Sequence, residues 1–341
     1  MPVHFPSLLK TILLLTGLTG GALLLAVAAG LSIGSTGFVG FAGFTSVNLG
    51  TLLFSGEEVD PVVQAIIWEI RLPRVILAAA TGATLALGGL VFQALLRNSL
   101  AEPYILGISG GSAVGAISGI IIGLSFFPGV TLLAMAGGMA TMVLILGLGE
   151  GSKTPGKDTL LLGGVMMNAF CGALIMLLLS LADDSLLRQV LFWLMGDLSR
   201  IERGQLPLLL LLVPSMVIIL LLARPMNLML LGRDAAAAMG IRVRAVSLTL
   251  LLLTSFMVAL VVSLAGTIGF VGLVVPHVFR LMMGPDHRLL IPACLLGGGA
   301  YLIFCDLIAR TLPTGGEIPV GVVTALIGAP LFIFLLWKAR A

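Results

Sequence analysis

Charged side chains are scarce in this sequence: Asp, Glu, Lys and Arg make up 10% of its 341 residues, against about 25% in typical soluble domains. A water-soluble globule of this length could not cover its surface with so few charges. The composition therefore excludes a soluble enzyme, a nucleic-acid-binding protein and a disordered chain. Aromatic residues are also few, at 6%, which disfavours a membrane β-barrel, because such barrels carry aromatic girdles at both interfaces.

Groups that bind metals or carry out catalysis are equally sparse. The three cysteines lie in apolar runs without a C-x-x-C pair, which predicts neither a metal site nor a disulfide framework. His277 and His287 stand ten residues apart with no partner cysteine or carboxylate cluster, so a structural or capping role is favoured over metal binding. No Ser/His/Asp set, H-E-x-x-H motif or carboxylate dyad appears. We therefore expect no enzyme activity, no bound metal and no cofactor in this chain.

Apolar residues dominate what remains, at 59% before the 44 glycines are counted. A helix needs about 20 apolar residues to cross a bilayer, and the apolar runs of the sequence predict ten spans. We expect an all-α polytopic protein forming a single transmembrane domain over residues 1–341, with an interfacial helix at 186–197. The predicted spans are 8–30, 72–92, 104–126, 130–149, 159–182, 206–223, 245–265, 268–283, 289–310 and 319–338.

The distribution of positive charge predicts the orientation. With both termini cytoplasmic, twelve of the 18 Lys and Arg residues fall on the cytoplasmic side, which agrees with the positive-inside rule. Six arginines are left on the outer side, and these need a separate explanation. They are Arg71, Arg74, Arg188, Arg200, Arg203 and Arg310.

Small residues recur at four-residue spacing in two of the spans. Such ridges let helix backbones approach closely, and a pore-lining glycine face is the alternative interpretation. One ridge holds Gly107, Gly111, Gly115, Gly119 and Gly123, and the other holds Ala78, Gly82 and Ala86.

Acidic residues are almost absent from the middles of the spans: Asp306 lies near the end of one, and Glu69 precedes another. A proton- or sodium-coupled carrier usually needs buried acidic groups or histidines along its path, so the sequence favours an external energy source. Residues 151–157 fit G-x-x-x-x-G-K, but Asp158 follows where a phosphate-binding loop needs Ser or Thr. We expect no nucleotide-binding domain here, so an ATPase would be a separate chain.

Three local stretches have unusual chemistry. Residues 71–74, Arg-Leu-Pro-Arg, hold two arginines at the outer end of a span, suited either to capturing carboxylates or to anchoring at the interface. Residues 231–244 predict a short alanine-rich helix that Asp234 caps or precedes and Gly240 ends; it fits either a groove on a partner or an ordinary connector. Residues 266–277 contain glycines and a proline, and such a broken helix must be buried or line a cavity.

Taken together, these stretches resemble the FecCD family, the permeases of binding-protein-dependent ABC importers for iron chelates, haem and vitamin B12. The resemblance covers about residues 60–340, and it departs mildly from the family pattern at Ser99 and at Gly110-Gly111. Four ordered passages carry it: 71–74 with 93–111, 224–240, 269–288, and 306–310 with 317–330.

The resemblance implies a type II importer permease with ten helices, working as a homodimer in the bacterial inner membrane. Two copies of a separate ATPase, which holds ATP and magnesium, bind the cytoplasmic face, and a substrate-binding protein docks outside. A metal chelate (an iron-siderophore, haem or a corrinoid) is carried inward by alternating access. An ion-coupled secondary transporter is the alternative.

The same resemblance implies roles for particular residues. The arginines that dock the binding protein map onto Arg71, Arg74 and Arg310. Gating maps onto Lys157, Asp158 and Thr159. The coupling helix that enters the ATPase maps onto Gly232, Arg233, Asp234, Ala235, Ala236, Ala237, Ala238, Met239 and Gly240.

Overall fold

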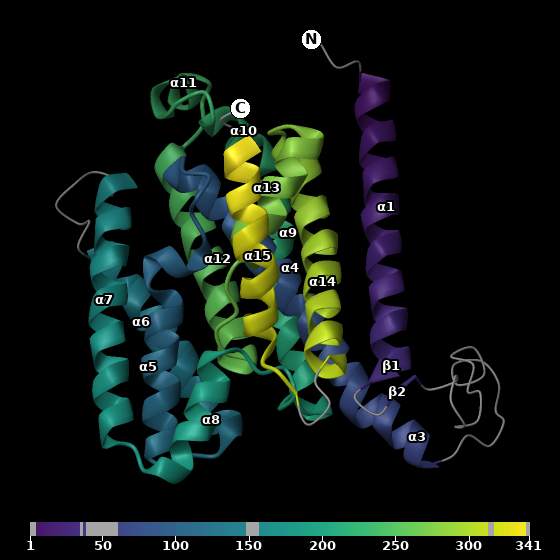
Figure 1. Ribbon diagram of the computed structural model, residues 1–341. Coiled ribbons are helices and arrows are strands. Elements are labelled where there is room, and N and C mark those ends of the chain that lie inside the picture. Colours follow the sequence, from purple (N-terminus) through teal and green to yellow (C-terminus); the bar gives the residue numbers. More distant parts are fainter. Residues whose placement is uncertain (1–4, 35–36, 39–60, 148–156, 313–316, 339–341) are drawn as a thin grey trace.

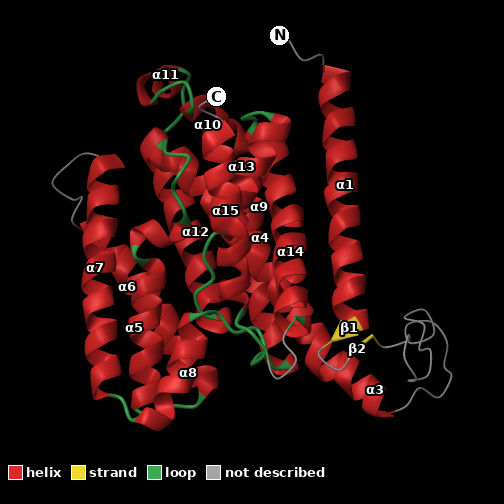
Figure 2. Ribbon diagram, viewed as in Figure 1, coloured by secondary structure: helices red, strands yellow, loops and turns green. Residues whose placement is uncertain are grey.

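The computed structural model describes residues 5–34, 37–38, 61–147, 157–312 and 317–338. Nearly all of these residues are helical, and the long helices stand side by side (Figure 1, Figure 2). Within this described part the strands are limited to β1 (Ile33–Gly34) and β2 (Gly37–Phe38), which pair antiparallel. The prediction of an all-α membrane protein is confirmed.

The helices differ widely in length. The longer ones are α1 (Phe5–Ser32), α4 (Leu72–Leu96), α6 (Thr131–Gly147), α7 (Lys157–Leu181), α12 (Val243–Ala265), α14 (His287–Thr311) and α15 (Val320–Lys338). The shorter ones are α3 (Pro61–Ala65), α5 (Ile108–Ile121), α8 (Asp184–Leu194), α9 (Leu212–Leu221), α10 (Ala223–Met229), α11 (Arg233–Ala238) and α13 (Val271–Met283). π-Helical segments cover Ile66–Arg71 and Phe126–Val130, and 3₁₀ segments cover Pro103–Leu106 and Arg203–Leu211.

The spans predicted from the sequence correspond to these helices. In the described residues, seven helices are long and apolar enough to cross a membrane, and three apolar helices, Ile108–Ile121, Val271–Met283 and Val320–Leu335, are shorter. Each of the ten predicted ranges overlaps one of these helices. Because three of them fall short of a full span, the number of crossings stays a prediction.

Helix α4 forms the centre of the fold, packed against α12, α13 and α14. Its ridge of small residues faces α14: Ala78 and Ala86 are fully buried, and a methyl group placed on Gly82 would overlap the carbonyl of Gly298. The backbones of α4 and α14 therefore touch where both lack side chains. For this ridge the packing interpretation is confirmed.

The glycine ridge of α5 packs in the same way against α6. A methyl group on Gly115 would overlap the carbonyl of Leu133, and one on Gly111 would lie 2.5 Å from the carbonyl of Gly137. The ends of the predicted ridge differ, because Gly107 and Gly123 lie just outside the helix with positive φ of 74° and 80°. Both positions have the left-handed backbone that favours glycine.

The two ends of the helix bundle carry different elements. Figure 1 shows the start of α1, the end of α15, α10 and α11 at one end, called the α11 end here. It shows α3, α8 and the short β1–β2 pair at the other, called the α8 end. The described termini thus lie on one side, as an even number of crossings requires. Helix α8 corresponds to the predicted surface helix at 186–197, and it buries Val190 and Trp193.

Candidate functional site

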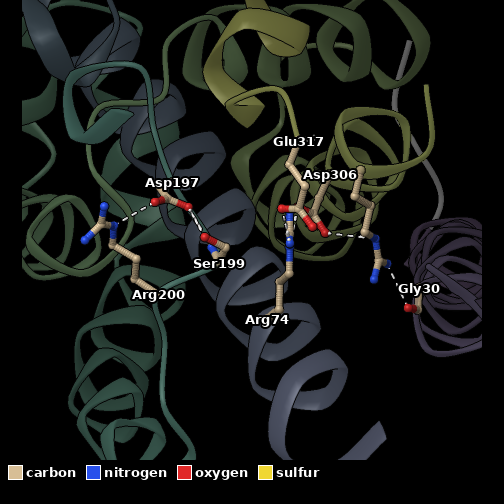
Figure 3. Close-up of polar contacts among 8 residues, drawn as sticks. Gly30, Arg74, Asp197, Ser199, Arg200, Asp306 and Glu317 are labelled. Carbon is tan, nitrogen blue, oxygen red and sulfur yellow. Dashed lines mark hydrogen bonds and ion pairs between the residues drawn. The ribbon is translucent and has the colours of Figure 1, made fainter. Parts of the chain in front are cut away.

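The α8 end contains a buried cluster of charges centred on Asp306 of α14. Arg74 of α4 contacts Asp306 through Nε at 2.9 Å and Nη2 at 2.8 Å, and its Nη1 lies 2.7 Å from Glu317 (Figure 3). The Asp306 side chain is fully buried, whereas that of Glu317 is 34% exposed. Arg74 therefore joins α4 to α14 and to the segment that leads into α15.

Two further arginines extend this cluster to α1. Arg310, one turn after Asp306, lies 3.5 Å from its Oδ2 and donates to the carbonyl of Gly30 at 2.7 Å (Figure 3). Arg71 donates to the carbonyls of Leu31 and Ser32 at 2.8 and 2.9 Å. All three predicted docking arginines thus lie together at the α8 end, where they hold α1, α4 and α14 in register.

The sequence placed these arginines on the outer face, but it did not show how deeply they are buried. Arg71, Arg74 and Arg310 are only 4%, 6% and 3% exposed. Pro73 lies in the first turn of α4, between Arg71, which contacts α1, and Arg74, which contacts α14. The acidic partners were missed because Asp306 and Glu317 follow Arg74 by more than 230 residues. The docking role of the three arginines stays a prediction.

Other arginines at the α8 end are more exposed. Arg200 pairs with Asp197 at 2.9 Å (Figure 3). It also stacks over Phe126, with its guanidinium carbon 4.2 Å from the ring centroid. Arg203 pairs with Glu69 at 3.2 Å, and both side chains are more than half exposed. Exposed pairs of this kind contribute little to stability.

The α11 end has a short helix standing apart from the bundle (Figure 1). Helix α11 lies between Gly232 and Gly240, both with positive φ, and it buries only Ala236. Its position matches the predicted coupling helix, and Gly240 follows the helix end as expected. The prediction that Asp234 caps or precedes this helix is wrong: Asp234 lies in the first turn, and Gly232 occupies the N-cap position. The coupling role itself stays a prediction.

The turn before α14 lies beside α10 at this same end. Asp286 is the N-cap residue of α14, and its side chain accepts from the backbone N–H of Arg288 at 2.9 Å. Burial would raise the pKa of Asp286, but hydrogen bonds from Arg288 and Asn227 outweigh burial and lower that pKa to about 2. The carboxylate is therefore charged at neutral pH and a strong acceptor.

An open cleft of about 670 Å³ lies between α5, α7, α8 and α15. None of its lining residues is Asp, Glu, Lys or Arg, and its polar groups include Ser109, Asn168 and Thr267. The Tyr104 hydroxyl lies 2.6 Å from both the N–H and the carbonyl of Ile268, which pins the irregular segment before α13. Phe270 in that segment has a positive φ of 69°. Of the two alternatives predicted for this broken helix, burial or lining a cavity, the structure shows the second for Thr267, Gly269 and Phe270, which line the cleft.

The predicted gate lies at the start of α7, which begins at Lys157. The side chains of Lys157 and Asp158 lie outside the described residues, as do residues 151–156 of the glycine-lysine stretch; Thr159 is exposed. Gating therefore stays a prediction.

The described residues contain no group of three or more His, Cys, Asp or Glu side chains placed to hold a metal ion. His277 contacts the Phe332 ring edge-on at a centroid distance of 5.5 Å, and His287 is buried beside Asn227.

Comparison with known proteins gives a consistent result. The chain is 39% identical over 308 residues to the vitamin B12 import system permease protein BtuC of Klebsiella pneumoniae, covering 87% of this chain and 93% of that protein. It is 39% identical over 287 residues to BtuC of Escherichia coli O9:H4, covering 84% and 87%. A solved metal-chelate type ABC transporter in an inward-facing conformation matches with a TM-score of 0.80 at 32% identity, over 98% of this chain and 100% of that one.

A more distant structure shares the fold alone: PsaBC from Streptococcus pneumoniae, with a TM-score of 0.54 at 17% identity over 77% of this chain and 89% of that one. The profile of the FecCD transport family matches residues 22–338. The family resemblance seen in the sequence is therefore confirmed: this chain belongs to the FecCD transport family.

Proposed function

We propose that this chain is the permease subunit of an ABC importer that moves a bulky metal chelate into the bacterial cytoplasm. The observation that carries the proposal is the family match over residues 22–338, joined to a cleft with no charged lining residue. The substrate class is an iron-siderophore, haem or a corrinoid, and relatives named as vitamin B12 permeases support the last of these. The protein lies in the inner membrane with both termini cytoplasmic.

The chain works as a homodimer, with the cleft of each copy facing the other. One cleft of about 670 Å³ is within the range of single small-molecule sites, about 300–1,000 Å³, and two copies would double that volume. A path without fixed charges does not hold a large ligand tightly, because no ion pair has to break before release.

Energy comes from a separate ATPase, which carries ATP and magnesium, and two copies bind at the α11 end. Helix α11 supports this step because it projects from the bundle and buries a single residue of its own. Asp306, near the end of α14, is already paired with Arg74 and Arg310. This carboxylate is therefore not free to bind a coupling ion, and it gives the ion-coupled alternative no support.

Transport by proteoliposomes tests the proposal directly. Uptake of the chelate is expected only when the permease, the ATPase and the loaded binding protein are all present with ATP. Uptake that persists with a hydrolysis-dead ATPase, or without the binding protein, would contradict it. The ligand that co-purifies with the binding protein identifies the chelate.

Docking of the binding protein is assigned to the buried arginine cluster at the α8 end. The cluster holds three guanidinium groups and two carboxylates, Asp306 and Glu317, which leaves an excess of one positive charge. A charge near the surface acts over about 8–10 Å at physiological salt. An acidic patch on the binding protein is therefore attracted even though the arginines are largely covered.

Arg71→Gln separates this charge from the structural role of the side chain. Glutamine can still donate to the carbonyls of Leu31 and Ser32, but it removes the positive charge. We expect the affinity of the binding protein to fall about tenfold, equal to about 1.4 kcal/mol, with a weaker dependence on salt. Titration of labelled binding protein at several ionic strengths measures both.

Arg71→Lys is the matched control, because it keeps the charge and a hydrogen-bond donor. Its affinity and salt dependence are expected to stay close to those of the unmodified protein. Equal affinities for the Gln and Lys variants would show that the charge of Arg71 does not contribute to docking.

A further inference from the structure

Helix α10 is fastened to the turn before α14 by one side chain, that of Asn227. Its Nδ2 donates to Asp286 Oδ1 at 2.6 Å. Its Oδ1 accepts from the backbone N–H of His287 at 2.8 Å and lies 2.8 Å from His287 Nδ1. Both halves of the amide are therefore bonded to two consecutive residues, which fixes the direction of the side chain as well as its position.

The turn that receives Asn227 is itself held firmly. Asp286 caps α14 and binds Arg288 through Nη2 at 2.6 Å, and His287 is only 2% exposed. Helix α14 then continues to Asp306, which is paired with Arg74 of α4. A force applied at Asn227 therefore reaches a helix that is anchored at its far end.

A second contact joins the arm, formed by α10 and α11, to α4. Arg97, which follows the last residue of α4, donates through Nη2 to the carbonyl of Met229 at 2.9 Å. Met229 ends α10, and three residues separate it from α11. The arm formed by α10 and α11 is thus held to both members of the central α4–α14 pair by polar contacts.

Helix α11 has little packing of its own to hold it in place. Only Ala236 is buried, and a methyl group on Gly232 or Gly240 would meet no atom within 4 Å. Its position relative to the bundle therefore depends on the arm behind it. Directional hydrogen bonds to a charged acceptor suit this purpose, because they resist sliding in a way that apolar contacts do not.

We propose that Asn227 is the joint that passes movement of α11 to α14 during transport. This inference rests on the proposed function, in which α11 contacts the ATPase. Asn227 is then a positioning residue: it touches neither substrate nor nucleotide, and it acts through the arm. Removing the hydrogen bonds of Asn227 should leave the ATPase bound and able to hydrolyse ATP, while α14 no longer moves with α11.

The test compares Asn227→Ala with Leu230→Ala, which truncates an exposed side chain just beyond the same helix. Full transporter in proteoliposomes is assayed for ATPase retention on the permease, ATP hydrolysis and chelate transported per ATP. We expect Asn227→Ala to keep ATPase binding and hydrolysis within about twofold while transport per ATP falls about tenfold, a change that one hydrogen bond to a charged group can produce. Leu230→Ala is expected to change none of the three.

An exchange of partners provides the rescue. Asn227→Asp alone places two carboxylates together and should uncouple at least as strongly as alanine. Combined with Asp286→Asn, it restores a donor–acceptor pair with the roles reversed, and asparagine still caps α14. Recovery of transport per ATP in the double variant is expected, and a purely local folding defect would not be reversed in this way.

The outcomes separate this inference from the proposed function. Normal transport per ATP in Asn227→Ala, or loss of ATPase binding together with transport, would overturn the joint while leaving an ATP-driven permease intact. Uptake by the unmodified protein without ATP would overturn the proposed function and the joint with it.

Discussion

Asp306→Ala is expected to prevent stable folding of the purified protein. The change leaves the guanidinium groups of Arg74 and Arg310 buried without their shared carboxylate. Removing one partner from a buried ion pair typically costs about 3–5 kcal/mol, because the remaining charge is no longer compensated. That is a large part of the about 5–15 kcal/mol by which proteins are stable. Thermal unfolding in detergent and the yield of folded protein from membranes measure the effect.

Glu69→Gln is the matched control, since it also removes a carboxylate paired with an arginine at the α8 end. Its partner Arg203 is 58% exposed, and Glu69 is 57% exposed. Such a surface pair contributes about 0–1 kcal/mol, so the unfolding temperature should hardly move. Equal behaviour of the two variants would show that the Asp306 cluster is not buried as described.

A triple change, Arg74→Met, Asp306→Leu and Arg310→Met, separates folding from docking. Replacing a buried ionic group by apolar residues of similar volume is often neutral or stabilising, so this variant is expected to fold where Asp306→Ala does not. It should nevertheless bind the substrate-binding protein weakly, because Arg71 and Glu317, the charges that remain in the cluster, cancel and its excess positive charge is lost. Folding with undiminished docking would restrict the cluster to a structural role.

The sequence predicted the helical class and the positions of the helices because apolar runs and glycine breaks are local signals. It also predicted α11, since the alanine run and Gly240 lie within one short segment. It could not predict the burial of Arg74, whose partners follow it by 232 and 243 residues. Spacing reports which face of a helix a side chain occupies, but only tertiary packing determines what covers that face.

Asn227 was missed for the same reason. It stands in a recognisable passage, yet its partners Asp286 and His287 follow 59 and 60 residues later. An asparagine near a helix end is ordinarily interpreted as a local turn or cap residue. The contacts of Asn227 with Asp286 and His287 can be recognised only once α10 and α14 are placed side by side.

Gly89→Ala is expected to destabilise the centre of the fold with the addition of one carbon. A methyl group at Gly89 of α4 would overlap the carbonyl of Gly272 in the first turn of α13. That carbonyl also accepts from Gln93 Nε2 at 3.3 Å. Overpacking in a tight core costs about 1–3 kcal/mol when the backbone has to move. Thermal unfolding in detergent measures the loss.

Gly20→Ala is the control, because a methyl group there meets no atom within 4 Å in α1. Alanine favours a helix over glycine by about 0.5–1 kcal/mol, so this variant should be as stable as the unmodified protein or slightly more so. Equal unfolding temperatures for Gly89→Ala and Gly20→Ala would contradict the close contact between α4 and α13.

The same variant distinguishes packing from pore lining, the two interpretations of small residues on membrane helices. A glycine that lined a transport path would tolerate alanine in the folded protein, and the extra methyl group would slow transport alone. Gly89 is buried between α4 and α13, away from the lining of the cleft, so stability should fall first. Helix α13 directly follows Gly269 and Phe270, which do line that cleft. Transport should therefore decline only as a consequence of the displaced helix, in proportion to the loss of stability.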